Sequence, residues 1–118
     1  MVNVLLIGNG AREHAIGEAL VRGGANLSAY MGKRNPGIAK LCNDNVKIGK
    51  LDNFTDIADF GKKNNVNFAV VGPEAPLAIG ITNALQAHDI PTVGPTIECA
   101  QLESSKIFTR SLLKKYNI

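Results

Sequence analysis

The chain opens with VNVLLI (residues 2–7), which runs straight into GNGAREH (residues 8–14). The first six residues carry no charge and are mostly aliphatic, a pattern typical of a strand buried on both faces of a parallel sheet. Gly8 and Gly10 let the chain turn without a Cβ clash, and a helix is expected to begin at once. The first turn of that helix presents unpaired N–H groups, the positive end of its dipole and Arg12 toward the carboxyl end of the strand. A phosphate or a carboxylate suits this position.

The glycines resemble a dinucleotide-binding fingerprint, but Glu13 stands where the third glycine of G-x-G-x-x-G would allow close packing of helix and strand. The stretch that ends the next expected strand is basic, with Lys33 and Arg34, so it offers no acidic residue for a ribose hydroxyl. We therefore favour a smaller phosphorylated ligand over a nicotinamide dinucleotide. A plain tight turn between strand and helix is the alternative, although such a turn has no need of Arg12, Glu13 and His14.

Length and composition narrow the class of protein. The 118 residues, 45% hydrophobic and 19% charged, suit one globular domain. A net charge of +3 on scattered Lys and Arg residues gives no reason to expect nucleic-acid binding. No apolar run approaches the ~20 residues of a membrane span. Cys42 and Cys99 lack the spacing of a metal or redox site, so we expect buried thiols and a reducing cytoplasm.

Strand and helix patterns alternate along the rest of the chain. Further strands are expected at 26–31, 45–48, 68–71 and 91–93, with helical periodicity between them. This alternation predicts an α/β fold with a Rossmann-like, doubly wound parallel sheet, whose ligand crevice lies at the carboxyl ends of the strands. A last amphipathic helix begins near Lys106. It either docks on the sheet or starts a further domain.

A second loop with ligand-like features follows the strand at 68–71. It reads GPEAPL (residues 72–77), and two prolines stiffen the backbone on either side of Glu74. In a Rossmann-like order this strand neighbours the first, which places Arg12 and Glu74 on opposite lips of one crevice. Glu74 then either accepts hydrogen bonds from a sugar hydroxyl or an amine, or caps the next helix. Glu13 likewise either caps its own helix or contacts an amine.

Five blocks together resemble the amino-terminal region of phosphoribosylamine–glycine ligases. They are GNGAREHA (8–15), RNPG (34–37), VGPEAPL (71–77), GPT (94–96) and AQLESSKIFT (100–109). Ala11 departs from the family, many members of which have glycine there. The resemblance runs in register over the whole chain, and the first and third blocks are specific in combination.

The resemblance implies an enzyme of purine biosynthesis that joins glycine to 5-phosphoribosylamine while cleaving ATP, with Mg²⁺ or Mn²⁺ at the phosphates. It implies a Rossmann-like domain of the pre-ATP-grasp type. Carried over by position, it assigns Lys106 to the ATP phosphates and no catalytic or metal-ligating residue to this chain. It assigns to the phosphoribosylamine site Gly8, Asn9, Gly10, Arg12 and Glu13, with Pro73, Glu74, Ala75, Pro76 and Leu77 opposite.

In this family the chain continues into an ATP-grasp domain that holds the nucleotide, the metal and much of the glycine site. We therefore expect a Rossmann-like unit at residues 1–103 and, at 104–118, a helix leading toward that domain. The 118 residues alone are expected to be inactive. Two other functions stay open: an NAD(P)-binding domain of an oxidoreductase, and a phosphosugar-binding module without catalysis.

Overall fold

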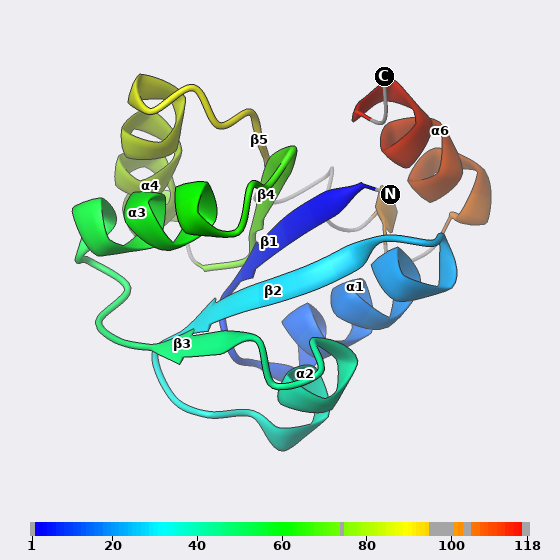
Figure 1. The fold of residues 1–118 in the computed structure, drawn as a ribbon, viewed down its shortest axis with the longest axis horizontal. Coiled ribbons are helices and arrows are strands. Elements are labelled where there is room, and N and C mark those ends of the chain that lie inside the picture. The colour runs from blue at the N-terminus through cyan, green and yellow to red at the C-terminus, as the bar shows by residue number, and fades with distance from the viewer. Residues whose placement is uncertain (1, 74, 95–100, 103–104, 117–118) are drawn as a thin grey trace.

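Strand and helix alternate as expected in the computed structural model, which describes residues 2–73, 75–94, 101–102 and 105–116 (Figure 1). The elements are β1 (Asn3–Ile7), α1 (Ala11–Arg22), β2 (Asn26–Met31), α2 (Pro36–Leu41), β3 (Val46–Ile48), α3 (Phe54–Lys63), β4 (Phe68–Val71), α4 (Ala75–Ala87), β5 (Thr92–Val93) and α6 (Lys106–Tyr116).

The five strands form one parallel sheet in the order β3-β2-β1-β4-β5. β1 lies at its centre, where Ile7 is level with Tyr30 on one side and Val71 on the other. The predicted α/β, Rossmann-like class is confirmed, and so is the prediction that β1 and β4 are neighbours. The loops after these two strands therefore leave the same edge of the sheet side by side.

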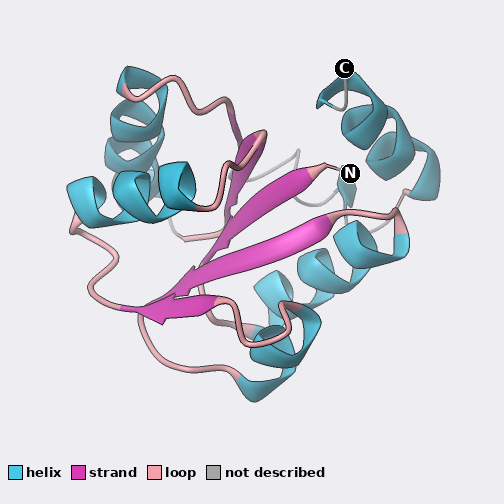
Figure 2. Ribbon diagram, in the orientation of Figure 1, coloured by secondary structure: helices cyan, strands magenta, loops and turns pink. Residues whose placement is uncertain are grey.

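Helices cover both faces of the sheet (Figure 2). On one face α1, α2 and α6 pack against a core that includes Leu6 of β1, and on the other α3 and α4 pack against a core that includes Leu5. Leu5 and Leu6 are both fully buried, because successive side chains of a strand point to opposite faces. This double burial explains why β1 carries no charge.

Local signals in the sequence fix several element ends. Asn53 caps α3, because its side-chain oxygen accepts a hydrogen bond from the backbone N–H of Asp56 at 3.3 Å. Ser105 plays the same part for α6, its hydroxyl accepting from the N–H of Phe108 at 3.1 Å. Gly24 follows α1 with a φ of +99°, a conformation that glycine adopts without strain.

The last helix, α6, docks on the sheet beside α1. Leu113 is buried in the core, and the Tyr116 ring stacks on the Phe68 ring of β4 with 4.5 Å between the ring centres. A Cβ on Gly23, directly after α1, would lie 2.5 Å from Leu113 Cδ1, so a larger residue there would have to displace the Leu113 side chain of α6. The predicted division at residues 103 and 104 stays a prediction, because both residues lie outside the described part.

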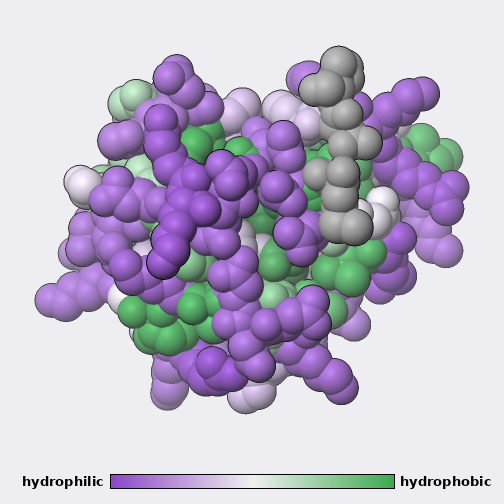
Figure 3. All heavy atoms as spheres, viewed as in Figure 1, coloured by the Kyte–Doolittle hydropathy of each residue, from purple (hydrophilic) through white to green (hydrophobic). Residues whose placement is uncertain are grey.

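Hydrophilic residues cover most of the face seen in Figure 3, with smaller hydrophobic areas between them. The large hydrophobic side chains that remain exposed in the described part are Ile48, Ile79 and Ile107. None of the described helices is both long and apolar enough to cross a membrane.

Candidate ligand-binding site

The glycine loop, residues 8–10, connects the central strand to the first turn of α1. Gly8 has a φ of +123°, and its N–H donates to the Tyr30 carbonyl at 3.0 Å, which extends the strand ladder by one step. Gly10 then precedes α1, and its carbonyl accepts the first helical hydrogen bond from His14 at 3.0 Å. The first N–H groups of α1 are thus presented at the carboxyl edge of the sheet, as predicted.

Glu13 folds back over the ends of β1 and β4. Its Oε1 accepts a 3.4 Å hydrogen bond from the Gly10 N–H, which is the capping role proposed for it. A Cβ on Gly72 would lie 2.5 Å from Glu13 Cγ, and a Cβ on Gly8 would also clash with this side chain. Glu13 therefore occupies the space that two glycines leave open, one from each loop.

The loop that begins at Gly72 lies against the glycine loop, because the Gly72 N–H donates to the Ile7 carbonyl at 3.1 Å. Pro73 is half-buried, Pro76 is exposed, and Leu77 packs against the core under α3 and α4. Arg12 is exposed on the first turn of α1. Glu74 lies outside the described residues, as does the side chain of Ala75, so the facing of Arg12 and Glu74 stays a prediction.

The loop after β2 supports the glycine loop, a role that the sequence did not predict. Asn35 Nδ2 donates to the Asn9 carbonyl at 3.0 Å, while Asn35 Oδ1 accepts from the N–H groups of Gly37 and Ile38. The His14 ring rests on Gly37, where a Cβ would lie 2.6 Å from its Cε1. The RNPG block (34–37) contributed to the family resemblance, but nothing in it predicted a contact with Asn9.

Lys106 lies far from this edge. Lys106 is the first residue of α6 and lies next to Arg22, at the end of α1. Arg12 lies at the start of α1, and the two ends of this twelve-residue helix are roughly 16 Å apart. Lys106, Arg22 and Arg110 line a cleft of about 360 Å³ between α1 and α6. The structure thus brings together the predicted residues of the glycine loop and the start of the 72–77 loop, but not Lys106.

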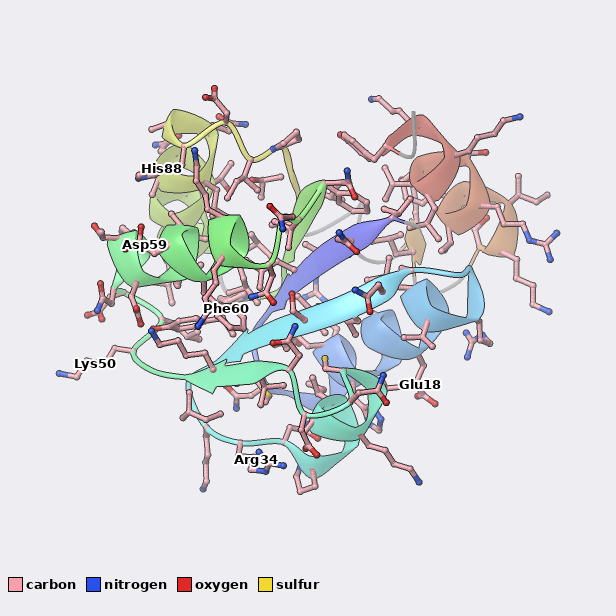
Figure 4. All side chains as sticks on the ribbon, in the orientation of Figure 1. Glu18, Arg34, Lys50, Asp59, Phe60 and His88 are labelled. Carbon is pink, nitrogen blue, oxygen red and sulfur yellow. The ribbon has the colours of Figure 1, made fainter. Side chains whose placement is uncertain are left out.

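A hydrogen-bonded cluster ties β2 and β3 to α3. Asp56 accepts from the Tyr30 hydroxyl at 2.6 Å and from Lys47 Nζ at 2.6 Å. The Lys47 hydrogen bond, followed by that of Tyr30, lowers the pKa of Asp56. Burial, with the neighbouring Asp56, raises the pKa of Tyr30. Phe60 points from α3 toward the sheet, its ring centre 6.2 Å from that of Tyr30, whereas Lys50 extends outward (Figure 4).

The remaining predicted features concern cysteine and metals. Cys42 is buried as a free thiol, and burial raises its pKa to about 12, so it behaves as the small apolar residue expected. Cys99 lies outside the described residues. Within the described part of the chain, no three His, Cys, Asp or Glu side chains gather as ligands for a metal ion.

Residues 2–103 match the family described as "Phosphoribosylglycinamide synthetase, N domain". The chain belongs to this family. It is 48% identical over 117 residues to phosphoribosylamine–glycine ligase of Pyrococcus horikoshii and 46% identical over 118 residues to that of Pyrococcus furiosus. These matches cover 99% and 100% of this chain but 26% and 27% of the relatives, so the chain spans about a quarter of their length. The resemblance found from the motifs is confirmed.

A solved structure described as glycinamide-RNase-transformylase T from Mycobacterium tuberculosis shares the fold. Its TM-score is 0.61 with 15% sequence identity, and the match covers 88% of this chain and 28% of that chain. At this identity the likeness concerns the fold alone.

Proposed function

We propose that this chain supplies the phosphoribosylamine-binding part of a phosphoribosylamine–glycine ligase of purine biosynthesis. The observation that carries the proposal is the meeting of the glycine loop and the 72–77 loop at one edge, with Glu13 packed between Gly8 and Gly72. Family membership supports the same conclusion. The proposed contacts are those predicted from the sequence, namely Gly8, Asn9, Gly10, Arg12 and Glu13, with residues 73–77 opposite.

The chemistry of the edge suits a ligand with an anionic end and an amine. The start of α1 and the Arg12 guanidinium favour a phosphate, while the neighbouring Glu13 carboxylate accepts hydrogen bonds from amines or hydroxyls. In this proposal the chain binds and orients the amine substrate. Another part of the complete ligase then supplies the activated glycine.

The same geometry disfavours a dinucleotide. A pyrophosphate in a Rossmann site approaches the glycine loop closely, and here a carboxylate folds over that loop from the third glycine position. The NAD(P)-binding alternative therefore has less support than a small phosphosugar.

The proposed site for the ATP phosphates is the cleft between α1 and α6. Lys106, Arg22 and Arg110 make this cleft positive, and none of the three forms an ion pair with a described residue. Three cations suit nucleotide phosphates, so Lys106 keeps its proposed role there. Mg²⁺ or Mn²⁺ would offset phosphate charge in the complete ligase, but the described residues do not gather donors for an ion. We also propose that the ligase is cytoplasmic and binds no nucleic acid.

Calorimetric titration with ribose 5-phosphate, a stable substitute for the labile amine, tests the proposal. Arg12→Ala removes the cation beside the glycine loop and should weaken binding at least tenfold, since hydrogen bonds to charged groups are worth ~1.5–3 kcal/mol. Lys63→Ala removes the same charge from α3, on the other face of the sheet, and should leave binding unchanged. Equal affinities of the two variants would contradict the proposed site.

A further inference from the structure

We propose that Asn35 is a positioning residue that sets the shape of the glycine loop for its ligand. The inference rests on the function proposed above and adds to it a residue from a different loop. Asn35 does not belong to the predicted site, and it lies after β2, not after β1 or β4. Its side chain nevertheless reaches the Asn9 carbonyl at 3.0 Å.

The orientation of the Asn35 amide is determined by its neighbours. Two backbone N–H groups, those of Gly37 and Ile38, point at one end of it from 3.0 and 3.2 Å. Only the oxygen can accept these hydrogen bonds, so Oδ1 must face α2 and the NH₂ group must face the other way. The Asn9 carbonyl lies there. Asn35 thus caps α2 and donates to the glycine loop in one conformation.

The peptide unit between Asn9 and Gly10 is held from both sides. Asn35 holds its carbonyl, and the Glu13 carboxylate holds its N–H at 3.4 Å. Rotation of this peptide would move the backbone groups that precede the first turn of α1. Because the Glu13 hydrogen bond is long, we assign most of the restraint to Asn35.

The residues that follow Asn35 are tightly packed. His14 of α1 packs on Gly37, where any Cβ would collide with the ring, and Ile38 is fully buried. The loop after β2 is therefore packed closely against the first turns of α1. A hydrogen bond from this packed loop restrains the glycine loop before the ligand binds. Less conformational entropy is then lost on binding, which is what a positioning residue provides.

The test compares two asparagine caps with the same substitution. Asn35→Ser keeps a neutral cap for α2 but is too short to reach Asn9, and Asn53→Ser makes the same change at the cap of α3. We expect both variants to melt within a few degrees of the unsubstituted chain. Ribose 5-phosphate should bind about threefold to tenfold more weakly to Asn35→Ser alone.

A second readout needs no ligand. In the unsubstituted chain, NMR should detect a scalar coupling across the hydrogen bond from Asn35 Nδ2 to the Asn9 carbonyl carbon. Amide exchange at Gly10 should quicken in Asn35→Ser but not in Asn53→Ser, a local effect that a general loss of stability would not produce.

The outcomes separate this inference from the proposed function. If the unsubstituted chain does not bind ribose 5-phosphate, the proposed site fails, and Gly10 exchange alone decides whether Asn35 positions the loop. Equal affinities and equal Gly10 exchange in the two serine variants would overturn the role of Asn35.

Discussion

At the scale of single residues, Glu13 explains why the glycine fingerprint is broken. The sequence predicted that this carboxylate either caps α1 or contacts an amine, and the structure shows the cap. It also shows a packing role against Gly72 that no local pattern could predict. The two residues are far apart in sequence, and only the pairing of β1 with β4 brings them together.

Gly72→Ala tests that packing. The added methyl group would lie 2.5 Å from Glu13 Cγ and 2.7 Å from Cδ, so we expect a loss of about 1–3 kcal/mol in the free energy of unfolding, typical of an overpacked position. The same substitution should cost much less in a Glu13→Ala background, because the clash is then gone. Urea unfolding of the two single variants and the double variant measures the coupling free energy between the two positions. Additive losses would show that Glu13 does not fill this space.

Asp56 provides a pH prediction. Its pKa is lowered from the usual 3.8, first by Lys47 and then by Tyr30, so the folded state favours the carboxylate. That stability is present above the unfolded pKa and is lost as the pH falls through the folded pKa. Between about pH 5 and pH 2, Asp56→Asn should therefore lose less stability than the unsubstituted chain. Asp59→Asn, an exposed position on the same helix, is the control, and matching pH profiles of the two variants would contradict the prediction.

At the scale of elements, the positions of the strands were largely predictable. β2 and β4 occupy the expected residues 26–31 and 68–71, because uncharged, mainly apolar runs between turn residues are distinctive. The sequence could not decide where α6 packs. Its apolar stripe requires burial, but the partner surface on α1 and β4 forms only when the sheet is assembled.

Truncation of Leu113 measures how much α6 contributes. Leu113 is 5% exposed and Ile107, on the same helix, is 80% exposed. Leu113→Ala should reduce the free energy of unfolding by about 2–5 kcal/mol, and Ile107→Ala by less than about 0.5 kcal/mol. Thermal or urea unfolding followed by circular dichroism decides this. Similar small losses in both variants would mean that α6 is not docked in solution.

At the scale of the whole molecule, the strand order brings the two loops of the proposed site together. The order β3-β2-β1-β4-β5 sets the loops after β1 and β4 side by side, which the alternation of strand and helix allowed us to predict. Two features lay beyond the sequence because they depend on three-dimensional distance. Asn35 reaches the glycine loop from the loop after β2, and Lys106 lies at the opposite end of α1.

The most direct measurement is a backbone-amide NMR titration of the chain with ribose 5-phosphate, repeated with NAD. We expect saturable shifts confined to residues 8–13 and to the loop that begins at Gly72, with no response to NAD. Shifts caused by NAD alone at the glycine loop would contradict the proposed function in favour of a dinucleotide site. Shifts at Arg22, Lys106 and Arg110 instead of the glycine loop would also contradict it, because the sugar phosphate would then occupy the cleft between α1 and α6.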